Sequence, residues 1–213
     1  RFSSFGKSGI VVIMKILYIF FVAGLLIFSL PLQITIAILI FLTSGRPVFY
    51  KQKRVGQNNI PFVLYKFRTM VRNADQMKKT LTKQNEAYGP VFKIRSDPRF
   101  TPIGSFLSHT GLDELPQILN ILKGNMAIIG PRPLPIEEVK KLKSWQKDRH
   151  AVKPGIISQW IVNGYHTQSF DDWMKSDVEY AKTKNVRADL LLFLKASAFF
   201  VSLIYKEMAS FLF

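Results

Sequence analysis

The sequence predicts a mixed α/β fold, in which a small sheet or hairpin is combined with several helices. Three observations lead to this expectation: a long uncharged run at residues 16–43, short apolar segments separated by Gly and Pro after it, and a second apolar segment at 188–213. We therefore expect an N-terminal flank and membrane helix at 1–45, a compact domain at 46–187, and an amphipathic segment at the membrane interface at 188–213.

Composition excludes several classes of protein. The chain has 213 residues, of which 48% are hydrophobic, and this apolar content is too high for a disordered basic tail. It has no cysteine, which rules out a disulfide framework, a thiolate zinc site, an iron–sulfur cluster and a cysteine nucleophile. The net charge of +16 is concentrated in residues 44–100, so we expect a polyanionic partner: nucleic acid, an anionic headgroup or a phosphorylated substrate.

The run from Ile16 to Thr43 contains no charged residue and exceeds the roughly 20 residues that a helix needs to cross a bilayer. Pro31, two residues after Ser29, removes a backbone hydrogen bond and is expected to break the helix. Basic residues flank the run on both sides, and the positive-inside bias puts both flanks on the cytoplasmic face. These features predict a re-entrant helix with its break at Ser29 and Pro31. Beyond the break, Gln33 and Thr35 are placed to satisfy the freed carbonyls.

Two alternatives to the re-entrant helix follow from the same run. A straight helix would make the chain a single-pass protein, such as a sensor, with its flanks on opposite sides of the membrane. A cleaved signal peptide would need a shorter apolar core and a small-residue cleavage pattern, neither of which the sequence shows.

Strands at 48–53 and 62–67, separated by a turn at 56–59, predict a hairpin. Helices are expected at 73–88, 136–147 and 170–184, and at 112–122 with a bend at Pro116. A short apolar strand is expected at 126–129. In the C-terminal segment the longest uncharged stretch, 196–205, is too short to span a bilayer, so we expect an interfacial helix, with packing in a protein core as the alternative.

Two adjacent acids, Asp113 and Glu114, begin the helix expected at 112–122, with Thr110 or Gly111 as its cap. Acids are common in a first helical turn because of the helix dipole, so the pair alone does not establish a site. Neighbouring helical side chains point about 100° apart, which excludes a face-to-face dyad. If both acids are functional, one acts as a nucleophile or metal ligand and the other orients or exchanges a proton.

Arg132 lies between two prolines in the segment Gly130-Pro131-Arg132-Pro133, which restricts the backbone around it. Arginine binds phosphate in a bidentate manner, and a restricted backbone lowers the cost of ordering it. A carboxylate that attacks an anionic phosphorus meets like-charge repulsion, so such a reaction needs cations from Mg²⁺, Lys and Arg.

Several segments, taken in order, are similar to the bacterial sugar transferases, which are monotopic phosphoglycosyl transferases. The similarity extends from about Ile16 to Asp189. The segments that carry it are Pro47-Val48-Phe49, Gln52, Arg54-Val55-Gly56, Tyr65-Lys66-Phe67-Arg68-Thr69-Met70, Leu112-Asp113-Glu114-Leu115-Pro116-Gln117, Asn120, Leu122-Lys123-Gly124 and Gly130-Pro131-Arg132-Pro133.

The resemblance implies an enzyme that moves a sugar 1-phosphate from a UDP-sugar to a membrane polyprenol phosphate and releases UMP, at the start of polysaccharide or glycoconjugate synthesis. It assigns the nucleophile and the Mg²⁺ ligand to Asp113 and a supporting role to Glu114. Lys66, Arg68, Lys123, Arg132 and Arg149 are the phosphate-binding candidates. The partners implied are the UDP-sugar, the polyprenol phosphate and the bilayer, without nucleic acid. The resemblance places the catalytic domain on the cytoplasmic face of the bacterial inner membrane.

Some positions depart from the family pattern. Residues 157–161 replace the usual Thr-Gly-Trp-Ala-Gln, Tyr165 stands where arginine is common, and Tyr18 occupies the place of a customary aspartate. Asp177 and Tyr180 match a family position, with helix packing as the alternative role. The segment 86–97 resembles the polysaccharide-initiating branch, whose members usually carry an additional N-terminal multispan region.

The three histidines, His109, His150 and His166, have no ligand spacing and are not expected to bind metal. The alternative to an enzyme is a non-enzymatic, membrane-bound basic protein that binds anionic lipid or nucleic acid.

Overall fold

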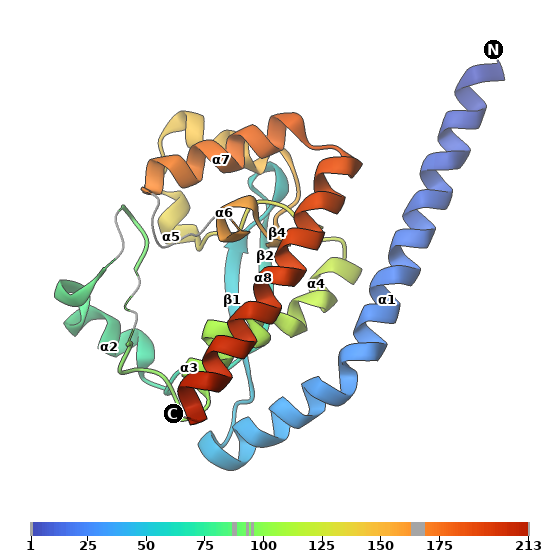
Figure 1. Ribbon diagram of the computed structural model, residues 1–213. Coiled ribbons are helices and arrows are strands. Elements are labelled where there is room, and N and C mark those ends of the chain that lie inside the picture. Colours follow the sequence, from blue (N-terminus) through green and yellow to red (C-terminus); the bar gives the residue numbers. More distant parts are fainter. Residues whose placement is uncertain (1, 87–88, 93, 95, 163–168, 213) are drawn as a thin grey trace.

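The architecture, seen in a computed structural model, combines helices with two small sheets and has a long apolar helix at each end of the chain (Figure 1). The structure describes residues 2–86, 89–92, 94, 96–162 and 169–212. Helix α1 covers Phe2–Ser44 and helix α8 covers Val186–Leu212. The mixed helix and sheet content agrees with the predicted fold class.

The predicted hairpin is confirmed. Strands β1 (Phe49–Val55) and β2 (Pro61–Phe67) pair antiparallel, with a register that runs from Phe49 opposite Phe67 to Val55 opposite Pro61. The turn between them is a short 3₁₀ segment, η1 (Gln57–Asn59). A second sheet consists of β3 (Ala127–Ile129) and β4 (Gly155–Ile157), which are parallel. The sequence predicted β3 but not its partner, because the two isoleucines after Pro154-Gly155 are too few to show a period.

Helices cover the hairpin on several sides. The long helix predicted at 170–184 is confirmed as α7 (Phe170–Thr183), and Ser169 caps it by accepting a hydrogen bond from the backbone N–H of Asp172. The bend expected at Pro116 is present as a change from 3₁₀ to α geometry, η3 (Leu112–Gln117) followed by α4 (Ile118–Leu122). The remaining elements are α2 (Ala74–Thr80), η2 (Thr82–Gln84), α3 (Gly104–Thr110), α5 (Ile136–Val139), η4 (Ser144–Ala151) and α6 (Gln159–Val162).

Two predicted helices differ from the structure. The helix predicted at 136–147 is wrong after Val139, where α5 ends, and the chain continues as 3₁₀ from Ser144. A tertiary contact explains the difference: Gln146 accepts a hydrogen bond from the Lys143 backbone N–H (2.8 Å) and donates one to Asp171 of α7 (2.8 Å). The helix predicted at 73–88 is shorter, with α2 ending at Thr80; residues 87–88 lie outside the described residues.

Helix α1 is continuous through Pro31 and bends along its length (Figure 1). Proline is a common cause of such bends. Thr35 Oγ1 donates to the Pro31 carbonyl (3.0 Å), whereas the Gln33 amide donates to Ser29 Oγ (2.9 Å). The helix is therefore continuous where a break was predicted, so the break is not confirmed, and re-entry into a single leaflet stays a prediction.

Two helical stretches are long and apolar enough to cross a membrane by length and composition. They are Val12–Ser44, with mean hydropathy 2.6, and Val186–Ala209, with mean hydropathy 1.7. The second stretch was expected to be too short to span a bilayer, because its longest uncharged part is 196–205. Its few charged residues do not lower the mean hydropathy enough to exclude a membrane-spanning helix by length and composition. Side chains along both stretches are mostly exposed, and Phe28 of α1 is 87% exposed.

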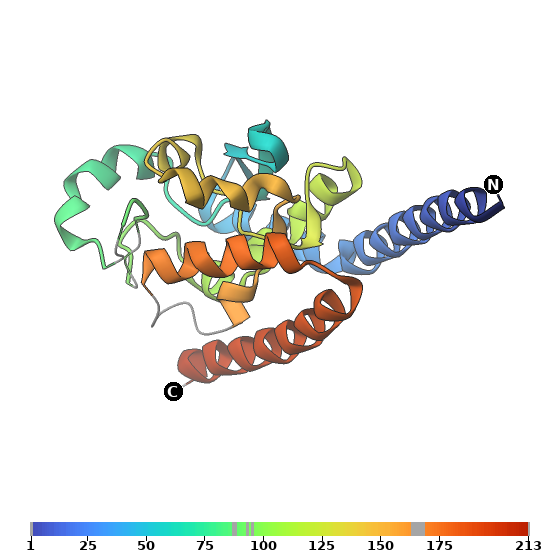
Figure 2. The ribbon, with the colours of Figure 1, turned by 90° about the horizontal axis from the view of Figure 1, so that it is seen from above.

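Helix α1 is attached to the rest of the protein at two places. Val22 is buried against Phe62 and Leu64 of β2 and against Ile118 and Ile121 of α4. Nearer its end, the helix contributes Ile36 and Ile40 to a cluster with Phe67 and Leu107. Between its N-terminus and the first attachment, the helix extends away from the other elements (Figure 2).

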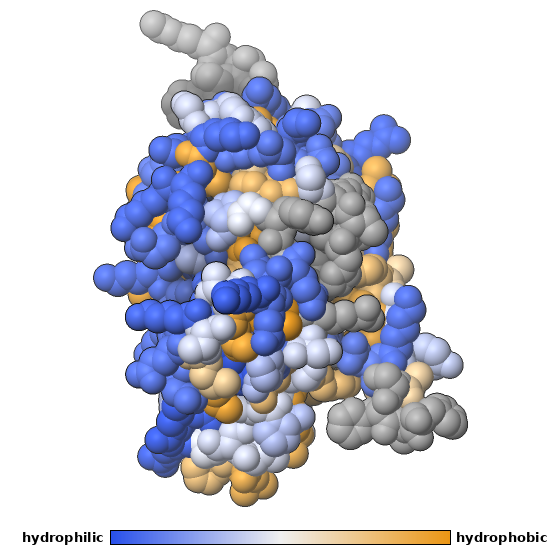
Figure 3. Space-filling view, turned by 90° about the vertical axis from the view of Figure 1, so that its left-hand side faces the viewer, coloured by the Kyte–Doolittle hydropathy of each residue, from blue (hydrophilic) through white to orange (hydrophobic). Residues whose placement is uncertain are grey.

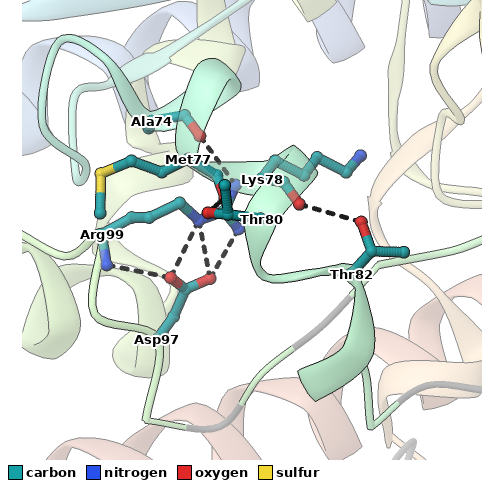
Figure 4. A network of polar contacts seen from close by, with 7 residues as sticks. All are labelled: Ala74, Met77, Lys78, Thr80, Thr82, Asp97 and Arg99. Carbon is teal, nitrogen blue, oxygen red and sulfur yellow. Dashed lines mark hydrogen bonds and ion pairs between the residues drawn. The ribbon is translucent and has the colours of Figure 1, made fainter.

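The side that carries α2 has a different surface from α1. It is largely hydrophilic (Figure 3), and Lys78, Lys79 and Lys83 are exposed there. A buried ion pair holds α2 in place. Asp97 binds the Arg99 guanidinium (2.6 Å), and Arg99 NH1 donates to the carbonyl of Ala74, the first residue of α2 (3.3 Å), as Figure 4 shows. The molecule is thus asymmetric, with apolar helices on one side and basic residues on another.

A second buried ion pair links η4 to α7. Arg149 NH2 lies 2.5 Å from Asp177 Oδ2, and both side chains are almost fully buried. Burial raises the pKa of Asp177 to about 6, and the Arg149 cation opposes that shift. The same Arg149 nitrogen donates to the backbone carbonyl of Arg132 (2.6 Å). Packing of α7 therefore determines where the 130–133 turn lies.

We expect Asp177→Asn to lower the free energy of unfolding by about 3–5 kcal/mol, because it leaves the Arg149 charge buried without a counter-ion. Chemical denaturation of the detergent-solubilised protein measures the loss. The matched control is Glu137→Gln, which removes an exposed ion pair with Lys140 and should have little effect. Equal stability of the two variants would contradict the prediction.

Candidate active site

Asp113 is a buried carboxylate with a lysine partner. It lies in η3, its side chain is 5% exposed, and Lys66 Nζ of β2 is 3.2 Å from Asp113 Oδ2. The Lys66 side chain is 24% exposed, so the buried Asp113 carboxylate has a partner that reaches the surface. The strand and the 3₁₀ segment pack against each other, which brings together two residues 47 positions apart in the sequence.

Gly111 is the joint that positions Asp113. It adopts a left-handed conformation (φ 74°), where it ends α3 and begins η3. Of the two predicted caps, Gly111 occupies the N-cap position of η3, whereas the Thr110 hydroxyl donates back to the Phe106 carbonyl (2.7 Å). A Cβ added to Gly111 would lie 3.1 Å from the Phe200 ring of α8. The joint therefore requires glycine for its backbone geometry and for the approach of α8.

Glu114 forms an ion pair with a different cation from the one that pairs with Asp113. Its Oε1 lies 2.8 Å from Arg132 NH1, and the Glu114 side chain is 15% exposed. The expectation that the adjacent acids point apart agrees with these contacts, because each acid meets a different cation. The Arg132 backbone is fixed by the Arg149 hydrogen bond and by tight packing at Gly130, where a Cβ would lie 2.4 Å from the Lys153 carbonyl.

The surroundings of Asp113 favour its protonated form. Burial raises the pKa of its carboxyl above the ordinary value, and the nearby Glu114 charge raises it further. Lys66 and Arg132 act in the opposite direction, with Lys66 the stronger of the two. The Lys66 cation therefore offsets part of the effect of burial on the Asp113 carboxyl.

A shallow cleft opens beside the two ion pairs. Its lining comprises Arg54, Leu64, Lys66, Glu114, Gln117, Arg132, Pro133 and Gly155. A second shallow hollow adjoins it across Arg132 and Pro133, and is lined by Arg149 and His150 among others. Cations thus outnumber acids on the wall of the first cleft, which suits an anionic ligand.

Arg54 is a site residue that the sequence analysis did not single out. It donates from NH1 to the Pro133 carbonyl (2.8 Å), and burial together with the neighbouring Arg132 charge lowers its pKa to about 10. The signal that could have identified it is the period of the predicted hairpin. Arg54 pairs with Phe62, and residues 62, 64 and 66 share one face of β2, so Arg54 and Lys66 face the same side.

The structure brings together four predicted residues: Asp113, Glu114, Lys66 and Arg132. Arg149 is buried and contacts this group through the Arg132 carbonyl. Arg68 is directed elsewhere: it donates to the backbone carbonyls of Ser44 (2.6 Å) and Gly45 (2.9 Å), at the end of α1. Lys123 is exposed, with its Nζ 3.0 Å from Tyr65 Oη. Ser29 and Pro31 lie within α1. Phosphate binding by Arg68, Lys123 and Arg149 stays a prediction.

The described side chains at the site could hold a magnesium ion only if substrate phosphates and water supplied most of its ligands. Among the described residues no group of three or more His, Cys, Asp and Glu side chains could hold a metal. Mg²⁺ commonly uses one or two carboxylates and takes its other ligands from substrate phosphates and water. Asp113 and Glu114 fit that mode. Of the histidines, His150 bonds Asn59 (2.7 Å), His109 Nδ1 lies 3.6 Å from Glu207, and His166 is outside the described residues.

Comparison with known proteins places residues 11–202 in a family described as bacterial sugar transferase. The galactosyl transferase CpsE of Streptococcus agalactiae is 41% identical over 152 residues, which is 71% of this chain and 34% of that protein. ExoY, an exopolysaccharide production protein of Sinorhizobium fredii, is 34% identical, covering 78% and 75% of the two chains.

An undecaprenyl-phosphate galactose phosphotransferase of Salmonella typhimurium is 34% identical over 72% of this chain. The matched region is 33% of that relative's length. The chain therefore spans about a third of the length of CpsE and of the Salmonella transferase, and three quarters of the length of ExoY.

We expect Gly111→Ala to destabilise the protein by about 1 kcal/mol or more, because alanine disfavours a positive φ and its methyl group would press on Phe200. Thermal denaturation provides the measurement. Gly24→Ala is the control, since its Cβ would meet no atom within 4 Å. A variant at Gly111 as stable as the one at Gly24 would show that this joint does not need glycine.

Proposed function

We propose that this chain, which belongs to the bacterial sugar transferase family, transfers a sugar 1-phosphate from a UDP-sugar onto a membrane polyprenol phosphate. The observation that carries the proposal is the buried Asp113, held by Lys66 beside the Glu114 and Arg132 pair on a cation-lined cleft. The name of the Salmonella relative supports the reaction class, because it specifies a sugar phosphate and undecaprenyl phosphate.

In the first step, an Asp113 carboxylate oxygen attacks the sugar-linked phosphorus of the donor. A new O–P bond forms, the P–O bond to the second phosphate breaks, and UMP leaves with that electron pair. Phosphoryl transfer depends on positioning and on neutralising charge. Lys66 and Arg132 supply positive charge on either side of the acid pair, which reduces repulsion between the carboxylate and the phosphate.

In the second step, an oxygen of the polyprenol phosphate attacks the same phosphorus. The bond between Asp113 and phosphorus breaks, which regenerates the carboxylate and leaves a sugar diphosphate on the lipid. Glu114 is adjacent and less deeply buried, and it can hold or release the proton of the incoming phosphate. Each acid thus has one role, as their different partners suggest.

Magnesium, when bound by Asp113 with help from Glu114, would supply further positive charge on the phosphate oxygens. The protein's own cations remain necessary in this proposal. Lys66 opposes the effect of burial by lowering the pKa of Asp113, and Arg132 orients the neighbouring carboxylate.

The membrane brings the acceptor to the cleft. Helix α1 exposes many large apolar side chains while its buried residues pack against β2, the strand that carries Lys66. We propose that α1 and α8 hold the protein on the inner membrane, with the cleft on the cytoplasmic side, where nucleotide sugars are available. The ExoY relative supports a role in exopolysaccharide synthesis.

The deciding experiment incubates the purified protein with polyprenol phosphate, Mg²⁺ and a panel of UDP-sugars, and measures UMP. We expect UMP with at least one donor and a loss of at least about 10³-fold in Asp113→Asn, because the amide is not a nucleophile. Asp172→Asn changes an exposed aspartate of α7 and is the control. Absence of UMP with every donor would favour the non-enzymatic alternative.

Lys66 should set the acid limb of the pH profile. Because its cation lowers the pKa of Asp113, Lys66→Met raises that pKa, and the carboxylate becomes ionised only at higher pH. We expect the acid limb of single-turnover UMP release to move to higher pH in this variant. Lys51→Met, an exposed lysine on the opposite face of the hairpin, is the control. A limb that stays in place or moves to lower pH would contradict the role given to Lys66.

A further inference from the structure

We propose that Arg54 binds the leaving phosphate, the one that departs as part of UMP. This inference rests on the proposed transfer reaction and adds a residue to it. Arg54 lies near the end of β1, on the hairpin face that also carries Lys66, and both line the cleft with Glu114 and Arg132.

The order of the contacts along the cleft distinguishes the side of the attacking carboxylate from the side of the leaving phosphate. Asp113 pairs with Lys66, the next residue Glu114 pairs with Arg132, and Pro133, which follows Arg132, accepts the hydrogen bond from Arg54. Attacking and leaving oxygens lie roughly in line on opposite sides of the phosphorus. A donor attacked by Asp113 therefore directs its second phosphate away from Asp113 and toward the Arg132 and Arg54 side of the cleft.

Among the described residues, no carboxylate forms an ion pair with Arg54, in contrast to the other cations of the cleft. Lys66 and Arg132 each contact an acid, whereas the Arg54 hydrogen bond goes to a neutral carbonyl. Its Nε is buried and has no hydrogen-bond partner among the described residues. Glu114 and Glu138 are near enough to favour its charge, and Arg132 opposes it. Excess positive charge is thus fixed at this end before a ligand arrives.

The chemistry of a leaving phosphate matches this guanidinium. Negative charge develops on the bridging oxygen and its phosphate as the P–O bond breaks. Arginine offers several N–H donors in a planar fork, and partial burial strengthens the resulting hydrogen bonds. The anchor to Pro133 orients the side chain, so little order is lost when the phosphate binds.

The test compares UMP with uridine as inhibitors of the transfer reaction. Both ligands share the nucleoside, and only UMP carries the phosphate assigned to Arg54. In Arg54→Gln we expect the inhibition constant for UMP to rise about tenfold or more, as for the loss of a charged hydrogen bond, with little change for uridine. Arg54→Lys should recover part of the UMP affinity because it keeps the charge and loses the fork.

The control is Lys53→Gln, which removes a positive charge from the next residue of β1, on the exposed opposite face. It should leave the ratio of the two inhibition constants unchanged. Thermal denaturation reports whether each variant is folded, and if Arg54→Gln does not fold, the same ratio measured in Arg54→Lys decides the question.

The outcomes separate two failures. If the parent protein releases no UMP from any donor, the proposed function is wrong. If the parent is active and the Arg54 variants weaken UMP and uridine equally, or weaken neither, Arg54 does not bind the leaving phosphate, while the transfer reaction stands.

Discussion

Neutralising two neighbouring carboxylates, one buried and one half-buried, is the constraint on which this structure depends. An unpaired buried charge is costly, and side chains of consecutive residues point in different directions, so one cation cannot serve both. Asp113 takes Lys66 from β2, and Glu114 takes Arg132 from the turn after β3. The hairpin and the second sheet must therefore meet η3 in one arrangement, and that arrangement forms the cleft.

The second cation needs support of its own, which comes from a distant part of the chain. Arg149 donates to the Arg132 carbonyl and is itself neutralised by Asp177 of α7. This sequence of contacts runs from a long, well-capped helix to the wall of the cleft. It explains how a turn that carries the half-exposed Arg132 keeps a fixed position, and it gives buried Arg149 and Asp177 a positioning role that requires no contact with a substrate.

The sequence was sufficient for the features that depend on local pattern. The hairpin, α7, the bend at Pro116 and the divergence of Asp113 and Glu114 follow from alternation, capping and helical geometry. The sequence could not identify the partner of each arginine, because a guanidinium can bind a phosphate, a carboxylate or a carbonyl. Arg68 thus binds the carbonyls at the end of α1, and Arg54 was overlooked. The short β4 and the end of α5 depend on tertiary contacts that no local pattern reveals.

The attachment of α1 links an apolar helix to the cleft through a few side chains. Phe62 and Leu64, on the face of β2 that carries Lys66, share a buried cluster with Val22 of α1, and Phe67 shares one with Ile36 and Ile40. Arg68, which follows the strand, donates to the carbonyls of Ser44 and Gly45 at the end of the helix. The segment from Phe62 to Arg68 therefore shares a core with the apolar helix, anchors its end and presents the lysine that lowers the pKa of Asp113. In the proposed function, a helix seated in lipid would fix that segment at a set height above the hydrocarbon. The positive charge concentrated in residues 44–100 would then face anionic groups next to the bilayer.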